Sequence, residues 1–224
     1  AGDRVFVMDR KALDTQEAKA KGARTGEKQG NERLLCLNAV TGKVIWEKAY
    51  DCPYTMSYSA GPRVTPLVDG DRVYTFGGEG NLICRATKDG SKKWAHDFKD
   101  LFNVKTQTWG FAASPLVHGD LLICLASGDG TTAVAFNKVS GKEVWRSLTA
   151  KQPGYCPPCI VKHKGRDLLL IWHPEAINAL DPLNGKIYWR VPWKVRYGLT
   201  ITAPQMVDDE HLFLSSFYNG STLL

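Results

Sequence analysis

One short element occurs four times in the chain and constrains its fold more than any other feature. Each copy has a tryptophan four residues after a glycine, and a threonine, aspartate, serine or asparagine stands near that glycine on its N-terminal side. The tryptophans are 48, 51 and 44 residues apart. The copies are LNAVTGKVIW (37–46), RATKDGSKKW (85–94), FNKVSGKEVW (136–145) and LDPLNGKIYW (180–189). A recurring period of this size predicts a repeat architecture.

Short apolar segments on both sides of each glycine predict a β-hairpin. NLICRA (81–86) leads into one turn and KKWAHDF (92–98) follows it. Asp-Gly and Asn-Gly between two such runs favour tight turns, because glycine adopts positive φ without steric cost. A second hairpin precedes the first in each period. Its copies are TPLVDGDRVYTFGG (65–78), SPLVHGDLLICLASG (114–128), PCIVKHKGRDLLLIWH (158–173) and APQMVDDEHLFLSS (203–216).

Each period therefore predicts four antiparallel strands, A to D, and the fold class is all-β. A period in the forties with four strands is typical of a β-propeller blade. The chain opens at a strand B and stops as a strand C begins. We expect three complete blades between two partial ones, within a single partial β-propeller domain over 1–224. The repeats end near residues 46, 94, 145 and 189.

Residues 10–33 interrupt the repeats. The segment is polar and highly charged and has no apolar period. It predicts a long, mobile polar loop insertion between strands B and C of the first blade, with a short helix near 11–21.

The Gly-x-x-x-Trp element resembles the tryptophan-docking motif of the PQQ-like β-propeller repeats, the superfamily of the quinoprotein alcohol dehydrogenases. It is also similar to the propeller of the outer-membrane β-barrel assembly lipoprotein. WHPEAINALDPLNGKIYW (172–189) and SSFYNGS (215–221) resemble a large, mostly uncharacterised bacterial branch of that family. The resemblance covers nearly the whole chain outside 10–33. It implies a ring of seven or eight blades, of which this chain is expected to be a fragment, in a periplasmic or otherwise extracytoplasmic protein.

The repeated tryptophans and glycines are predicted to be structural. In stacked blades, a flat indole on the outer strand fills the gap to the next blade, and such a side chain buries about 150–250 Å². Four equivalent copies favour packing over ligand stacking. These residues are Trp46, Trp94, Trp145 and Trp189, with Gly42, Gly90, Gly141 and Gly185.

Composition and motifs exclude several classes of function. No apolar run approaches the ~20 residues of a membrane-spanning helix. The net charge is +6, but lysine and arginine are spread along the chain, which argues against a nucleic-acid surface. The sequence contains no Gly-x-Ser-x-Gly, P-loop or His-Glu-x-x-His motif. It therefore predicts no catalytic residue.

Cofactor signals are also lacking. The resemblance to quinoprotein dehydrogenases would imply PQQ, a bound Ca²⁺ and a catalytic aspartate, often with a Cys-Cys disulfide beside the cofactor. The chain has no adjacent cysteine pair, no Cys-x-x-Cys-His and no evident cluster of Ca²⁺ ligands. The sequence supports no cofactor and predicts no metal site; PQQ and Ca²⁺ belong only to an alternative interpretation.

Ligand sites of such propellers gather on the face formed by the B–C and D–A loops. The resemblance places acidic and aromatic groups there, which would suit a protein segment, a polar small molecule or a saccharide at the channel face. The candidates are Glu79, Trp109, Asp129, Tyr155, His173, Glu175, Tyr197 and Asn219. His173 with Glu175 leads, because their loop departs from the Gly-rich pattern of the others. Gly-rich loops with one acidic residue are also ordinary turns, so a structural role remains the alternative.

Cys156 and Cys159 form a Cys-x-x-Cys pair, a spacing that serves redox enzymes and zinc sites. Two prolines between them favour extended backbone, which would hold the Cα atoms roughly 9–10 Å apart, whereas a disulfide needs about 7 Å or less. We therefore expect the start of a strand A here, and Tyr155 is the better functional candidate.

The other cysteines divide into two groups. Cys36 and Cys84 share a repeat position that alanine occupies in the other copies, and Cys124 lies in a strand B. We expect these three in the core. Cys52, in a D–A loop, is expected to be exposed.

The sequence as a whole favours a non-catalytic, extracytoplasmic binding or scaffolding propeller. The alternative is a PQQ-dependent alcohol or sugar dehydrogenase whose cofactor residues lie partly outside this chain. A weaker alternative is a sugar-active propeller enzyme.

Overall fold

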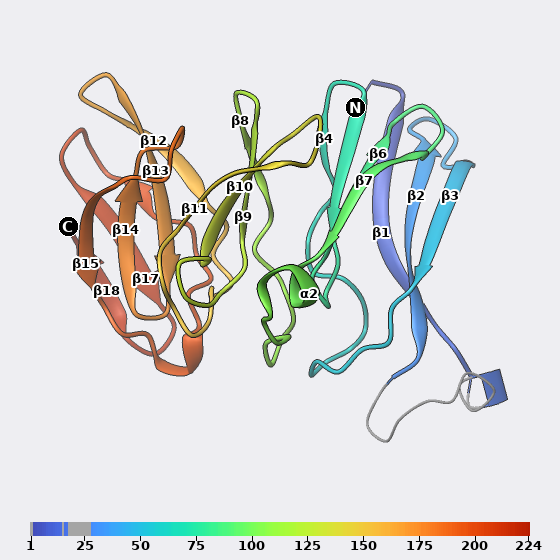
Figure 1. Cartoon of the computed structure of the whole chain (residues 1–224), viewed down its shortest axis with the longest axis horizontal. Coiled ribbons are helices and arrows are strands. Elements are labelled where there is room, and N and C mark those ends of the chain that lie inside the picture. The colour runs from blue at the N-terminus through green and yellow to red at the C-terminus, as the bar shows by residue number, and fades with distance from the viewer. Residues whose placement is uncertain (1, 15, 18–27) are drawn as a thin grey trace. The chain divides into compact units, whose positions relative to one another are not determined.

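The computed structural model describes residues 2–14, 16–17 and 28–224, and it consists of five antiparallel sheets in chain order (Figure 1). The first and last sheets have three strands and the three between them have four. The strands of the first two sheets are β1 (Arg4–Ala12), β2 (Gly30–Asn38) and β3 (Val44–Asp51), then β4 (Leu67–Asp69), β5 (Arg72–Phe76), β6 (Asn81–Ala86) and β7 (Lys92–Asp97). The all-β fold and the predicted count of three complete and two partial blades are confirmed.

The remaining three sheets follow a short helix, α2 (Phe98–Phe102). Their strands are β8 (Leu116–His118), β9 (Leu121–Leu125), β10 (Ala133–Asn137) and β11 (Glu143–Ser147), then β12 (Cys159–His163), β13 (Arg166–His173), β14 (Ala176–Leu180) and β15 (Ile187–Pro192), and last β16 (Gln205–Met206), β17 (Leu212–Ser216) and β18 (Gly220–Leu223), with a 3₁₀ turn η1 (Arg196–Gly198) between β15 and β16. No helix in the described part of the chain is long and apolar enough to cross a membrane.

The chain divides into two compact units. The first contains residues 1–101 and 105–112, and the second contains 102–104 and 113–224. The first unit holds the sheets β1–β3 and β4–β7, and the second holds the other three. Both are built from the same repeat, and a single domain over 1–224 remains a prediction.

The repeated turn between strands C and D of a blade is closed by a hydrogen bond to the side chain at its start. Asn38 Oδ1 accepts a hydrogen bond from Thr41 N at 2.8 Å, and Asn137 Oδ1 accepts one from Ser140 N at 2.9 Å. The glycine that ends such a turn has positive φ, +68° at Gly42. An asparagine or aspartate followed four residues later by glycine therefore fixes the hairpin locally.

The repeated tryptophan lies directly across from a small residue of the preceding strand. Cys36 pairs with Trp46 and Cys84 with Trp94, while alanines face the other two. Each of these four sheets has a register shift immediately after this pair. Cys36, Cys84 and Cys124 are fully buried, as expected, and the preference for small residues follows from the indole that stands opposite.

In the first unit, Trp46 joins two sheets. Its Nε1 donates a hydrogen bond to the Thr87 carbonyl at 3.1 Å, and Thr87 lies in the turn after β6. A Cβ built on Gly90 would stand 2.8 Å from Trp46 Cε3. The turn glycine thus has two roles: it accepts φ of +71° and leaves room for the indole of the preceding sheet.

The same arrangement recurs in the second unit. Trp145 Nε1 donates to the Pro182 carbonyl at 3.1 Å, and a Cβ on Gly185 would lie 2.6 Å from Trp145 Cε3. Trp145 belongs to a buried cluster with Leu169, Ile171 and other apolar side chains from β9, β10 and β13. A second cluster, around Trp172, joins β13 and β14 to β17. Burial of these large side chains between sheets is the main stabilising force in the unit.

The predicted insertion is shorter than 10–33. β1 extends to Ala12 and β2 begins at Gly30, and these two residues pair across the hairpin. Residues at both ends of the segment are therefore strand, because the backbone ladder continues although the side chains are polar. Of the helix expected near 11–21, residues 11 and 12 belong to β1 and residues 16 and 17 are helical; residues 15 and 18–27 lie outside the described part.

Two cysteine predictions have different outcomes. β12 begins at Cys159, which confirms that the Cys-x-x-Cys pair leads into a strand, and Cys156 and Cys159 are both free thiols. The expectation that Cys52 is exposed is wrong. Its side chain is buried with Tyr54 and Met56, and its Sγ lies 3.6 Å from Asn81 Oδ1, at the start of β6 in the next sheet.

Candidate functional site

Four loops of the second unit meet and form what we call the loop cluster, residues 151–156, 173–175, 193–200 and 215–219. Val195 N donates to the Pro174 carbonyl at 2.7 Å, and Tyr155 N donates to the Thr200 carbonyl at 3.0 Å. A Cβ on Gly154 would lie 2.0 Å from Thr200 Oγ1, so glycine is required where these two loops touch. Backbone hydrogen bonds thus set the relative positions of the loops.

His173 and Glu175 lie together in this cluster, as the sequence suggested. Glu175 N donates to His173 Nδ1 at 3.3 Å, and Glu175 Oε1 accepts from Lys151 N at 3.4 Å. His173 is only 1% exposed. Burial lowers the pKa of His173 to about 4; Glu175 opposes this shift and Arg190 adds to it. The imidazole is therefore neutral at pH 7, and its Nδ1 accepts the hydrogen bond from Glu175 N.

The other candidate residues of the second unit differ in their exposure to solvent. Tyr155 is buried in the cluster, whereas Tyr197 and Asn219 are exposed in it. Asp129 is also exposed, but it lies in the loop between β9 and β10, where its Oδ1 accepts a hydrogen bond from Thr149 Oγ1 at 2.8 Å. No described contact joins Asp129 to the loop cluster.

Glu79, in the first unit, is a buried carboxylate that ties loops together. It accepts hydrogen bonds from Thr55 N at 2.7 Å and Thr106 Oγ1 at 2.6 Å, and Lys99 Nζ lies 3.2 Å away. Burial by itself would raise the pKa of Glu79, but these hydrogen bonds and the ammonium outweigh it and hold the pKa below its usual value.

Trp109 lies in the same unit, in the segment that carries Thr106. Its carbonyl accepts a hydrogen bond from Arg63 Nε at 2.7 Å. Glu79 and Trp109 therefore help to hold two long connections in place.

A second buried carboxylate, Glu32, was not predicted from the sequence. It is fully buried and accepts hydrogen bonds from the hydroxyls of Tyr50 and Tyr54 and, at 2.9 Å, from Gly78 N. Burial, followed by the nearby Glu32 charge, raises the pKa of both tyrosines. A Cβ on Gly77 would lie 2.2 Å from Glu32 Oε2. The Gly-Gly pair at 77–78 was the available signal, since it makes room for this carboxylate.

Exposed aromatic side chains gather at the edge of the loop cluster, around one arginine. The Arg196 guanidinium lies 4.8 Å from the ring centroid of Tyr197 and 5.6 Å from that of Tyr218. The two tyrosine rings are 5.4 Å apart, and Phe217 lies 4.8 Å from Tyr218. Tyr197 and Asn219 were predicted from the sequence as site residues, whereas Arg196 and Phe217 were not, because their proximity arises from two loops about 20 residues apart.

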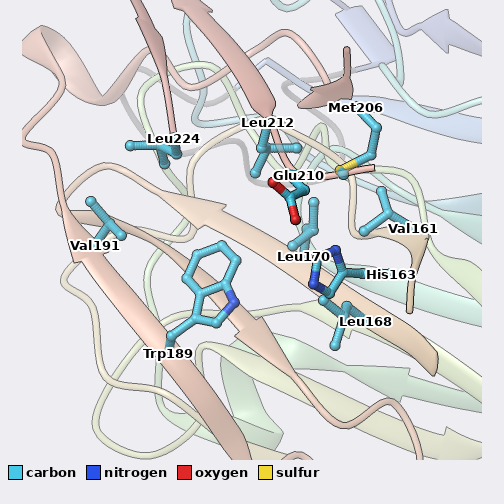
Figure 2. Close-up of a pocket in the computed structure, with 10 residues that line it drawn as sticks. All are labelled: Val161, His163, Leu168, Leu170, Trp189, Val191, Met206, Glu210, Leu212 and Leu224. Carbon is cyan, nitrogen blue, oxygen red and sulfur yellow. The ribbon is translucent and has the colours of Figure 1, made fainter. Parts of the chain in front are cut away.

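A groove with a volume of about 310 Å³ lies between the sheets β12–β15 and β16–β18 (Figure 2). Its lining is apolar except for His163 and Glu210. The lining residues are Val161, His163, Leu168, Leu170, Trp189, Val191, Met206, Glu210, Leu212 and Leu224. Trp189, the last of the repeated tryptophans, stands at one side of the groove and is 36% exposed.

The described residues do not fit a Ca²⁺–PQQ centre. No group of three or more His, Cys, Asp or Glu side chains gathers among them. The buried carboxylates of the first unit already accept hydrogen bonds from tyrosine, threonine and backbone donors, and Lys99 balances the charge of Glu79. These groups are satisfied by the fold itself.

The antiparallel sheets are blades of up to four strands, and Trp46 and Trp145 are each seated against the glycine turn of the following sheet. Together these features define a β-propeller of PQQ-like repeats. At the family level, the chain matches the outer membrane protein assembly factor BamB over residues 2–97 and 30–222, and it belongs to that family. No curated protein sequence matches the chain.

Solved structures agree with this fold. BamB from Moraxella catarrhalis is 17% identical, with a TM-score of 0.53, and the match covers 98% of this chain and 61% of that one. A europium-containing methanol dehydrogenase is 12% identical (TM-score 0.56; 90% and 48% covered), and the quinohemoprotein alcohol dehydrogenase from Comamonas testosteroni is 17% identical (0.51; 80% and 37%). The chain therefore spans about six-tenths of the length of the BamB structure and less of the enzymes.

Proposed function

We propose that the chain is a non-catalytic, extracytoplasmic propeller that binds a protein partner and acts as a scaffold. The proposal rests on one observation: the candidate acid–base side chains are shielded from solvent, whereas an arginine and several aromatic side chains are exposed. Glu32, Glu79 and His173 are buried and hydrogen-bonded, whereas Arg196, Tyr197 and Tyr218 present rings and a cation to solvent. Exposed aromatic and arginine side chains are typical of protein-binding surfaces.

Family membership supports the same proposal. The family is described as an outer membrane protein assembly factor, which favours a place in the cell envelope and a protein partner over a saccharide. The tryptophans would then serve as docking groups between blades, as the contacts of Trp46 and Trp145 suggest, and leave the loops free to bind.

The alternative is a quinoprotein oxidoreductase that uses PQQ and Ca²⁺. Its support is the fold similarity to alcohol and methanol dehydrogenases, which is shared by enzymes and non-enzymes alike. When bound, PQQ would accept the electrons of the oxidised alcohol. On this alternative, the cofactor residues would lie partly outside this chain.

One pair of experiments separates the two functions. The protein is cross-linked in intact cell envelopes and purified, and bound proteins are identified by mass spectrometry; in parallel, it is incubated with PQQ and Ca²⁺ and assayed for alcohol- or sugar-dependent dye reduction. We expect a specific partner whose capture falls when Tyr197 and Tyr218 are replaced by alanine, and no dye reduction. PQQ-dependent dye reduction without a partner would contradict the scaffold function.

A further inference from the structure

The exposed edge of the loop cluster carries what we call the aromatic–arginine surface, made of Arg196, Tyr197, Phe217 and Tyr218. Phe217 is 83% exposed, Tyr197 59% and Tyr218 50%. Each ring contacts at least one other, and the guanidinium lies over both tyrosines. Three neighbouring aromatic side chains in solvent have an apolar area that a binding partner would cover.

This surface is held in shape by the loops beneath it. Arg196 N donates to Asn219 Oδ1 at 2.9 Å, and Asn219 Nδ2 donates to the Lys194 carbonyl at 3.2 Å, so the two loops are joined by one side chain. Tyr197 has φ of +57° and ψ of 12°, a left-handed conformation that is unfavourable for a bulky residue. A strained residue with an exposed ring indicates that the position of the ring matters.

The charge of the surface is unbalanced. Segments 193–202 and 215–221 contain Lys194 and Arg196 but no aspartate or glutamate. Among the described residues, the ion pairs do not include Arg196; its Nη2 donates to the Tyr197 hydroxyl at 3.0 Å. A guanidinium has five N–H donors, so most of them remain directed to solvent.

Two other arginines also lie near aromatic rings, but their N–H donors are used in hydrogen bonds within the chain. Arg146 also lies over a ring, that of Phe102 at 5.7 Å, but its Nε and Nη2 both donate to Glu143. Arg63 lies near the exposed Tyr58, which also has positive φ, but it donates to three backbone carbonyls. Arg196 is therefore oriented by aromatic rings while its capacity to bind a carboxylate is unused.

We propose that the aromatic–arginine surface binds an acidic segment of the partner protein. A carboxylate of that segment pairs with Arg196, and an apolar or aromatic side chain beside it packs on Tyr197, Tyr218 and Phe217. Charge complementarity selects the partner, because a carboxylate forms a bidentate pair with a guanidinium, and the rings supply apolar contact at low cost in side-chain entropy. The inference rests on the proposed binding function and adds the chemistry of the bound segment.

Fluorescence anisotropy with the whole chain tests this directly. The probe is a fluorescein-labelled peptide that repeats Asp-Phe-Glu three times, and it is compared with the same design carrying Lys-Phe-Lys or Asp-Ser-Glu repeats. We expect the Asp-Phe-Glu peptide to bind best and its affinity to fall with added salt. Arg196→Gln and Tyr218→Ala should each weaken binding about tenfold. The matched controls Arg146→Gln and Tyr58→Ala should leave it unchanged.

Three outcomes overturn the inference: equal or tighter binding of the Lys-Phe-Lys peptide, no binding of the Asp-Phe-Glu peptide, or unchanged binding in both Arg196→Gln and Tyr218→Ala. If the Asp-Ser-Glu peptide binds as tightly as the aromatic one, the role of the rings is wrong. The envelope experiment separates this from the proposed function. A partner captured equally well by the Arg196→Gln protein leaves the scaffold function standing without this surface, whereas absence of any captured partner contradicts the scaffold function itself.

Discussion

Trp145 and Trp189 occupy the same position in successive repeats of the second unit, yet their surroundings differ. Trp145 is 7% exposed, bonded to the Pro182 carbonyl and packed against Gly185. Trp189 is 36% exposed and lines the groove of Figure 2. The comparison shows that the motif supplies one half of a contact. For Trp145, the glycine turn of the following sheet supplies the other half, through the Pro182 carbonyl and Gly185.

The largest expected difference follows from removal of each indole. Trp145→Ala should lower the free energy of unfolding by about 4 kcal/mol, because it leaves a cavity and an unpaired carbonyl. Trp189→Ala should cost about 2 kcal/mol, since part of that ring already faces solvent. Urea denaturation followed by far-UV circular dichroism measures both. Equal losses would mean that the two tryptophans contribute equally to the free energy of unfolding, although their exposure differs.

The contact between Trp145 and Gly185 can also be tested by changing the glycine alone. Gly185→Ala should lower the free energy of unfolding by about 3 kcal/mol, because the new Cβ meets the Trp145 ring and φ is +72°. Gly165→Ala is the matched control: its φ is +78°, but a Cβ there meets nothing within 4 Å. It should cost about 1 kcal/mol, the strain alone. If the same denaturation measurement gives equal losses, the collision with the indole is unimportant.

Acid should destabilise the sheet β12–β15, whose glycine turn contacts Trp145 and whose last strand carries Trp189. Burial lowers the pKa of His173 to about 4, below its usual 6.5. The unfolded chain therefore binds the proton more tightly, and the stability from the neutral imidazole is complete above pH 6.5 and is lost as pH falls toward 4.

The expected loss is about 2 kcal/mol between pH 7 and pH 5, because over this range the unfolded chain binds the proton and the folded chain does not. His173→Asn retains an acceptor near the Nδ1 position and should remove this part of the pH dependence. Denaturation midpoints of both proteins at the two pH values give the answer. A variant with an unchanged pH dependence would assign the effect to other groups.

Thiol labelling gives the smallest and most local difference. Cys159 is half-buried and packs with the cluster beside the groove, whereas Cys124 is fully buried in β9. Burial raises the pKa of Cys159 to about 11 and that of Cys124 further. Single-cysteine proteins should show Cys159 reacting at least about tenfold faster with a maleimide, and Trp189→Ala should accelerate Cys159 alone. Equal acceleration of Cys124 would indicate global rather than local opening.

Much of the fold could be predicted because its signals are local in sequence. The Asn-to-Gly spacing, the alternation around each turn and the period of the tryptophans each act within one hairpin. The B–C hairpin of the first blade could not be predicted in the same way. Its extension to Ala12 and Gly30 depends on backbone pairing and on Glu32, a charged residue held in the core by Tyr50 and Tyr54.

The candidate site was predicted only in part. The sequence placed His173 and Glu175 in one loop, and the structure brings them together. It could not tell that Glu79 and Tyr155 are buried while Tyr197 is exposed, because exposure depends on loops from other repeats. Whether any of these residues binds a ligand remains a prediction.

By itself, the sequence determined the blade: four strands, a turn closed by asparagine or aspartate, a glycine with positive φ and a tryptophan opposite a small residue. These are properties of neighbouring residues, for which backbone sterics and short hydrogen bonds suffice. Only the tertiary structure decided that Trp145 is buried and Trp189 partly open, that Cys52 is inside, and that Arg196 lies on two tyrosine rings. Each of these depends on surfaces from distant parts of the chain, whose contact energies the local sequence does not contain.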